Sequence, residues 1–214
     1  IIANPNCSTI IALVPLWPLH QVARIKRGVV STYQAVSGAG AKALEELELQ
    51  TRAWAGGKPV EKNVFPHQIA FNLFSHNSKI GEDGFNEEET KMTKETWKIF
   101  DDPSVALTAT CVRVPTFRSH AESINVEFER PLSPEEARAI LARSPGVKIV
   151  DDREKNLFPM PLETSGQDLV HVGRLRKDPS RENALWLFVS GDQLRKGAAT
   201  NAVQIAELVL AERK

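Results

Sequence analysis

Cysteine and net charge are what this sequence has least of. It contains two cysteines, Cys7 and Cys111, and its 27 basic side chains are balanced by 27 acidic ones. Two cysteines cannot form a disulfide framework, and neither stands in a Cys-x-x-Cys pair or near a histidine at the spacing of a metal site. We therefore expect reduced thiols, an intracellular protein and no bound metal. Without net charge, no overall field attracts nucleic acid or an anionic membrane, so a small molecule or a protein is the expected partner.

Long apolar runs are also absent. No run reaches the roughly 18 residues that a membrane span requires, because Pro15, Pro18 and His20 interrupt the N-terminal apolar stretch. We expect a protein that does not enter a membrane. The sequence starts at Ile1 without an initiator methionine or a basic targeting segment, which indicates a fragment or a processed chain. A length of 214 residues predicts one large domain with one hydrophobic core.

Turn residues divide the first hundred residues into short segments. Asn4-Pro5-Asn6 predicts a turn between residues 1–3, which are typical of the end of a buried strand, and an apolar helix over about 7–19. β-branched residues predict a strand over 25–33. Further predictions are a helix ending at Gly56-Gly57, a long packed loop over 58–85, and a helix from Asn86 to about Phe100 with Met92 and Ile99 facing inward.

Strand patterns dominate the second half. They cover 106–114, 120–129, 147–151, 169–176 and 184–190, with one short helix beginning at Ser133-Pro134. Short connections favour a largely antiparallel sheet, so the expected fold class is α+β, with a mixed, mainly antiparallel sheet and helices on one face. Residues 197–212 predict a helix that is apolar on most of its circumference, which another surface must cover.

Cys7 is the first candidate for chemistry. It stands at the predicted start of a helix, where unpaired N–H groups and the positive end of the helix dipole stabilise a thiolate. A lone cysteine beside isoleucine and alanine can equally be a small buried hydrophobic residue. Cys111 alternates with Leu107 and Ala109 on one strand face, which predicts structural burial.

Two polar residues follow Cys111. Arg113 continues the alternating apolar face, where a permanent charge needs a carboxylate partner or a bound substrate. His120 carries an imidazole suited to proton transfer at a sulfur or an oxygen. The other histidines are predicted to be surface or packing residues, namely His20, His67, His76 and His171.

Two weaker signals involve anion binding. Glu88 and Lys91 lie three residues apart on one helix face, where they could bind the charged groups of a ligand or form a solvated ion pair. Spacing alone favours the ion pair. Ser37-Gly38-Ala39-Gly40 could bring backbone N–H groups to an anion, but glycines before a helix are common.

Taken together, these segments resemble aspartate-semialdehyde dehydrogenases through the whole chain. The motifs occur in the order and spacing of that family, and they are Asn4 to Thr9 around Cys7, Ser31 to Gly40 with Gln34, Glu87 to Met92, Val112 to Pro115 with His120, and Lys196 to Gln204. The resemblance implies a fold like the C-terminal domain of glyceraldehyde-3-phosphate dehydrogenase. It also implies a homodimer formed by the sheet face opposite the helices.

The activity implied by the resemblance is the NADPH-dependent reductive dephosphorylation of β-aspartyl phosphate to aspartate β-semialdehyde, in lysine, threonine and methionine biosynthesis. Cys7 would displace phosphate and form a thioester, His120 would act as acid and base, and Gln34 would orient the acyl group. The binding positions also match residue by residue. These are Arg113 for the substrate carboxylate, Glu88 for its ammonium group, Lys91 for phosphate, Asn6 for the developing oxyanion, and Ser37, Gly38 and Asn201 for the neighbourhood of NADP.

The main departure from the family is a domain that we expect and do not find. Family members begin with a dinucleotide-binding domain, and no Gly-rich phosphate-binding turn after a strand occurs in this sequence. We therefore predict a catalytic and dimerisation domain over 1–196 and a C-terminal helix over 197–214 that would pack on the absent NADP-binding domain. Without that domain the helix should expose apolar surface, and the isolated chain should be catalytically silent.

Two other functions stay open. An N-acetyl-glutamyl-phosphate reductase would use Cys7 and His120 on the same fold, although the sequence Asn6-Cys7-Ser8-Thr9 favours the aspartyl enzyme. A non-catalytic dimerisation module would need neither residue. The resemblance implies a cytoplasmic protein, or a plastid protein if the source is a plant or an alga.

Overall fold

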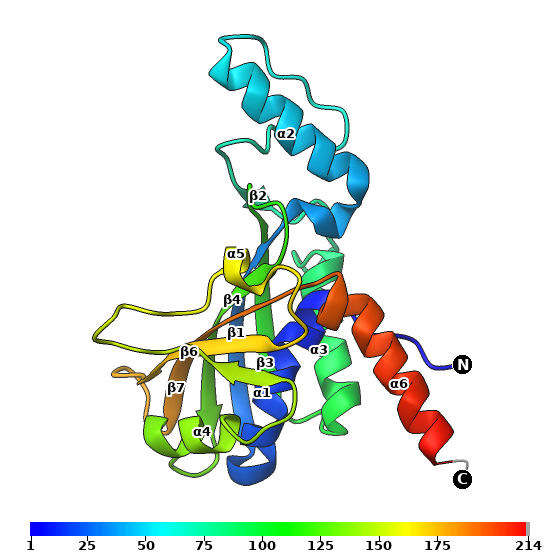
Figure 1. Cartoon of the computed structure of the whole chain (residues 1–214). Helices are drawn as coiled ribbons and strands as arrows, with labels where there is room; N and C mark the ends of the chain where they lie inside the picture. Colours follow the sequence, from blue (N-terminus) through cyan, green and yellow to red (C-terminus); the bar gives the residue numbers. More distant parts are fainter. Residues whose placement is uncertain (213–214) are drawn as a thin grey trace.

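A seven-stranded sheet organises the chain, as seen in a computed structural model that describes residues 1–212 (Figure 1). The strand order is β2-β3-β1-β4-β7-β6-β5. The strands are β1 (Ile25–Gln34), β2 (Phe74–Ser75), β3 (Ala106–Arg113), β4 (His120–Phe128), β5 (Val147–Ile149), β6 (Val170–Lys177) and β7 (Ala184–Gly191). The pairs β1–β3 and β5–β6 are parallel and the other pairs are antiparallel, which confirms the predicted mixed, mainly antiparallel sheet.

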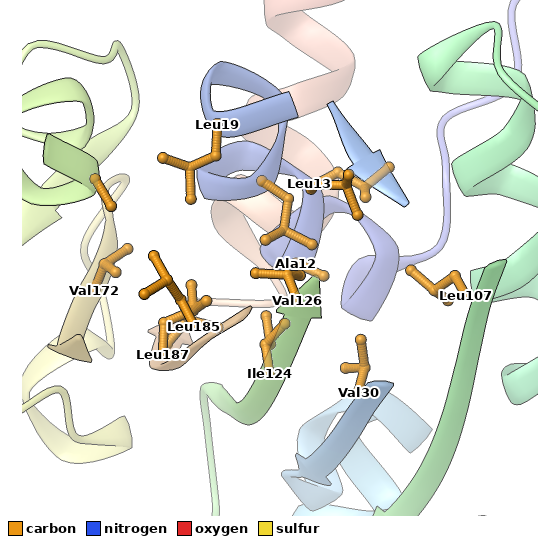
Figure 2. Packing of buried hydrophobic residues seen from close by; sticks show 14 of the residues in the cluster. Ala12, Leu13, Leu19, Val30, Leu107, Ile124, Val126, Val172, Leu185 and Leu187 are labelled. Carbon is orange, nitrogen blue, oxygen red and sulfur yellow. The ribbon is translucent and has the colours of Figure 1, made fainter. Parts of the chain in front are cut away.

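Three helices cover one face of the sheet, namely α1 (Cys7–Ala23), α3 (Glu87–Phe100) and α4 (Pro134–Leu141). Figure 2 shows Leu13 and Leu19 of α1 directed at the core that Val30, Ile124 and other sheet residues form. Burying one such side chain stabilises the fold by roughly 1.5–3 kcal/mol. Because α1 is buried along most of its length, the residue at its start, Cys7, is held in a fixed place relative to the sheet.

Local capping explains where these helices begin. Asn6 caps α1, because its side-chain oxygen accepts hydrogen bonds from the N–H groups of Ser8 and Thr9 at 3.0 and 3.3 Å. Asn86 with Glu89, and Ser133 with Glu136, form complete capping boxes at the starts of α3 and α4. The predicted starts of all three helices are confirmed.

The helix α2 (Ala41–Ala55) and the loop that follows it project beyond the sheet (Figure 1). This loop is the predicted packed loop, and it is held on α2 largely by polar contacts. Glu46 accepts hydrogen bonds from the backbone N–H groups of residues 63–65, and the side-chain oxygen of Gln50 accepts from those of Ile69 and Ala70. The loop therefore has a defined path back to β2 and to the end of β3.

The C-terminal helix α6 (Thr200–Ala211) follows a π-helical turn over Arg195–Ala199. None of its described residues is buried, and Val203, Leu208 and Leu210 are 58–66% exposed. The predicted apolar helix with exposed apolar surface is confirmed. The last two positions of the predicted range 197–214 lie outside the described residues.

Two predictions about local structure are wrong. Residues 1–3 are exposed and lie in no strand, because apolar side chains alone do not supply a strand with a pairing partner. Ile99 is 42% exposed, whereas Met92 is buried as predicted. The inner face of α3 follows Met92, Thr96 and Phe100 at four-residue spacing, which leaves Ile99 on the flank.

Candidate active site

Four candidate residues meet where one end of the sheet reaches the start of α1. Gln34 and Arg113 are the last residues of β1 and β3, and they are register partners across that parallel pair. His120 is the first residue of β4, which runs antiparallel to β1 and so begins at the same end. Cys7 is the first residue of α1. The sheet topology therefore gathers residues that lie more than a hundred positions apart in the chain.

The thiol of Cys7 and the imidazole of His120 are in contact, with Sγ 3.4 Å from Nε2. On the other side of the ring, Nδ1 accepts a hydrogen bond from the backbone N–H of Ala35 at 3.0 Å. Burial, assisted by the charge of Arg113 and by His76, lowers the pKa of His120 well below its ordinary value, so the ring is neutral at pH 7. A neutral ring that accepts at Nδ1 carries its proton on Nε2, facing the sulfur.

The ionisation of Cys7 differs from the expectation drawn from its place on a helix. Burial raises the pKa of the thiol to about 11, and Glu88 adds to this effect. The backbone N–H of Ser8 opposes the shift, as expected at a helix start, but does not outweigh it. Cys7 is partly exposed, so a ligand can reach it, yet the dipole of α1 alone does not hold a thiolate in the free chain.

Arg113 is buried with its guanidinium in polar contacts. Nη1 donates to the carbonyl oxygen of Ala35 at 2.7 Å, and Nη2 donates to Nε2 of His76 at 2.7 Å. The ring of Phe65 lies below it, 5.7 Å from Cζ. One peptide unit on each side of Ala35 thus orients both His120 and Arg113. The predicted paired arginine is found, although its partners are a carbonyl group and a histidine.

The prediction that His76 is a surface or packing residue is wrong, because it contacts Arg113 and belongs to the site. Burial and the charge of Arg113 lower the pKa of His76 to about 4, so Nε2 is free to accept from the guanidinium at neutral pH. The side chain comes from the long loop between α2 and α3. Nothing in the composition of that loop indicates this contact, since it depends on how the loop folds back.

The remaining predicted substrate residues form one network beside Cys7. Asn6 Nδ2 donates to Glu88 at 2.6 Å, and Lys91 Nζ lies 3.4 Å from the other oxygen of Glu88. Gln34 Nε2 donates to the hydroxyl of Ser8 at 2.6 Å. Glu88 and Lys91 therefore do form the ion pair that their spacing indicates, and they form it against the segment that carries the cysteine.

The three positions matched to the cofactor lie in different surroundings. Gly38 is exposed, and a Cβ placed on it would lie 3.3 Å from both Arg113 Nη1 and His120 Cε1. Ser37 is buried and accepts a hydrogen bond from Gln193. Asn201 donates to Asn4 Oδ1 at 2.8 Å, which joins the start of α6 to the segment before Cys7. Gly38 alone of the three borders the reacting groups directly.

Two findings concern other classes of site. Among residues 1–212, no group of three or more histidine, cysteine, aspartate or glutamate side chains is arranged to hold a metal ion. Within the same part of the chain, every helix is too short or too polar to traverse a lipid bilayer.

Comparisons with known proteins point in one direction. Residues 16–196 match the family described as semialdehyde dehydrogenase, dimerisation domain. Aspartate-semialdehyde dehydrogenases from Aquifex aeolicus and a Synechocystis species are 55% and 54% identical over 99% and 98% of this chain. A crystal structure of aspartate semialdehyde dehydrogenase II complexed with ASA, from Vibrio cholerae, matches 99% of the chain with a TM-score of 0.95 at 45% identity. The chain spans about 62% of the length of these proteins.

Proposed function

Because the chain belongs to the semialdehyde dehydrogenase family, whose dimerisation domain it carries, we propose that it supplies the reacting groups of an aspartate-semialdehyde dehydrogenase. The observation that supports this proposal most is the contact of Cys7 Sγ with His120 Nε2 at 3.4 Å, next to a buried arginine. A nucleophile, a hydrogen-bond donor and a carboxylate-binding group are the parts that this reaction requires.

The first step in the proposal is acyl transfer to Cys7. The sulfur attacks the acyl carbon of β-aspartyl phosphate, the C–O bond to phosphate breaks, and a thioester and inorganic phosphate result. Arg113 binds the substrate carboxylate through two N–H groups, which fixes the acyl carbon before the attack. Since Nη2 donates to His76 in the free chain, the substrate carboxylate replaces His76 at that nitrogen.

His120 acts in this proposal through the proton on Nε2. It donates a hydrogen bond first to the sulfur anion and then to the oxygen anion that develops on the acyl carbon. Complete transfer of that proton would leave an imidazolate, unless Nδ1 gains a proton at the same time. The N–H of Ala35 occupies Nδ1, so acid and base action by His120 requires that this hydrogen bond be broken.

The cofactor in this proposal is NADP, which supplies the hydride that reduces the thioester when it is bound as NADPH. Of the residues matched to it, Gly38 fits the group, because a planar ring can approach Arg113 and His120 only where no Cβ intervenes. Ser37 and Asn201 shape that region from behind, through Gln193 and Asn4. When the reduced adduct collapses, its C–S bond breaks, Cys7 leaves as a thiolate and the aldehyde is released.

A chimeric enzyme tests the proposed function. The portion of the Aquifex aeolicus protein that this chain matches is replaced by residues 1–214, and oxidation of aspartate semialdehyde is measured with NADP and phosphate. We expect turnover that Cys7→Ser abolishes, and no turnover by the chain alone. Turnover by the chain alone would contradict our expectation that these residues do not complete the reaction. A chimera that prefers N-acetylglutamate semialdehyde would favour the other reductase.

A homodimer is the proposed assembly, through the sheet face opposite α1. That face carries Tyr33 and Phe188, whose rings are 6.4 Å apart, and Arg176 over the ring of Trp186. Aromatic rings and arginine are enriched in protein interfaces. Sedimentation equilibrium of the chain should give twice the monomer mass, and a monomer at all concentrations would contradict this assembly.

A further inference from the structure

Glu122 is a carboxyl group that the reaction above does not use, and it is fully buried two residues from His120. It lies on β4, and its exposed fraction is 0%. Neither of its oxygens has a hydrogen-bond partner among residues 1–212. Alternate strand residues share a face, so Glu122 and His120 project from the same face of the sheet, the one that α1 covers.

The register of the sheet surrounds Glu122 with polar neighbours. Thr32 on β1 is its cross-strand partner, and Gln34 lies two residues further along the same face, level with His120. Directly opposed residues have Cβ atoms roughly 5 Å apart. The hydroxyl of Thr32 and the side-chain oxygen of Gln34 also have no hydrogen-bond partner within the described chain. A buried group of oxygens therefore lies beneath the first turn of α1, next to Cys7.

Such a group of acceptors is stable only if Glu122 is neutral. An ionised carboxylate buried without a hydrogen-bond donor or a cation is strongly unfavourable, whereas a carboxylic acid adds one donor to the group. Burial correspondingly raises the pKa of Glu122 well above its ordinary value. Glu122 is also one of the groups whose negative charge, when present, raises the pKa of the Cys7 thiol.

Other charged or titratable groups act on the same sulfur from the elements around it. They are Glu88 of α3, Arg113 of β3, and His120 at the start of β4, with His76 of the preceding loop acting on His120 and Arg113. Arg113 favours the thiolate and Glu88 opposes it. Among the carboxylates that oppose it, Glu88 is bound by Asn6 and Lys91, whereas Glu122 has no such partner in residues 1–212.

We propose that Glu122 is a buried proton-holding residue that controls how readily Cys7 ionises. As a neutral acid it leaves the sulfur anion to the hydrogen bonds of His120 Nε2 and the Ser8 N–H group. Once ionised, it opposes the thiolate through the low-dielectric interior. Glu122 is thus a positioning residue for charge, and this inference rests on the proposed nucleophilic function of Cys7.

The test is the pH dependence of Cys7 alkylation by iodoacetamide in the wild-type chain and in Glu122→Gln, followed by mass spectrometry of each cysteine peptide. The two rate profiles should coincide at low pH, where Glu122 carries its proton. They should separate as pH rises, with Glu122→Gln reacting on the order of tenfold faster, because one charge within roughly 10 Å has been removed. Coincident profiles up to pH 10, or a variant slower at every pH, would overturn the proposal.

Three controls keep the outcome readable. Glu127→Gln removes a carboxylate from the same strand at its far end, where Lys26 and Arg181 bind it, and should leave the profile of Cys7 unchanged. If Glu122→Gln does not fold, the infrared spectrum of the wild-type chain decides. A carboxylic acid C=O band at neutral pH supports the proposal, and its absence overturns it. Failure of wild-type Cys7 to react faster than Cys111 would instead contradict the proposed function.

Discussion

The link between helix capping and the reacting sulfur leads to a quantitative prediction for Asn6→Ala. This change removes the acceptor for two N–H groups at the start of α1 and the donor to Glu88 at 2.6 Å. Loss of an N-cap costs about 1 kcal/mol. Loss of a hydrogen bond to a charged group costs about 1.5–3 kcal/mol. Because Glu88 retains its contact with Lys91, we expect the free energy of unfolding to fall by about 2 kcal/mol in total.

Urea unfolding of three variants separates the two contributions. Asn6→Ser keeps a capping oxygen but cannot reach Glu88, so it should lie between the wild-type chain and Asn6→Ala. Asn6→Asp keeps the cap and places a second carboxylate against Glu88, so its stability should improve relative to Asn6→Ser as the pH is lowered. A loss below about 0.5 kcal/mol in Asn6→Ala would refute the reasoning. Equal losses in Asn6→Ser and Asn6→Ala would remove the contribution assigned to capping.

Three further predictions concern the same site. The folded-state pKa of His76 is depressed to about 4, so between pH 6.5 and 4 the unfolded chain binds a proton that the folded chain does not. Stability should therefore fall as pH falls through this window, and less steeply in His76→Gln, as measured by urea unfolding at pH 7 and pH 5. In Gly38→Ala the added Cβ must displace Arg113 or His120, and we expect a loss of about 1 kcal/mol with slower alkylation of Cys7 by bulky maleimides. Nitrogen NMR of His120 should show a protonated Nε2 and an unprotonated Nδ1 at pH 7, and the opposite tautomer would contradict the hydrogen bond from Ala35.

Much of the fold could be predicted because its signals are local. The capping boxes that begin at Asn86 and Ser133 place the starts of α3 and α4 within a few residues of sequence. Alternation of apolar residues up to Arg113 identifies β3 and its buried face. Residues 1–3 could not be assigned in this way, because a strand requires a partner that composition does not reveal. The strand order likewise depends on pairings between distant segments.

The site was predictable where one residue conflicts with its local pattern. Arg113 is conspicuous as a charge on an apolar face, and Cys7 as a thiol at a helix start. His76 has no such conflict, because it lies in a loop without periodicity, and only the folded path of that loop brings it to Arg113. The pKa of Cys7 was misjudged for a related reason, since burial by distant segments outweighs the local helix dipole.

The most direct test of the central claim, that Arg113 places a carboxylate-bearing substrate against Cys7, compares two alkylating reagents on the chain itself. Iodoacetate carries a carboxylate and iodoacetamide does not, so the ratio of their rates reports a carboxylate-binding group beside the sulfur. We predict that this ratio is higher at Cys7 than at Cys111, and that Arg113→Gln lowers it at Cys7 alone. A ratio at Cys7 that is unchanged by Arg113→Gln would contradict the account.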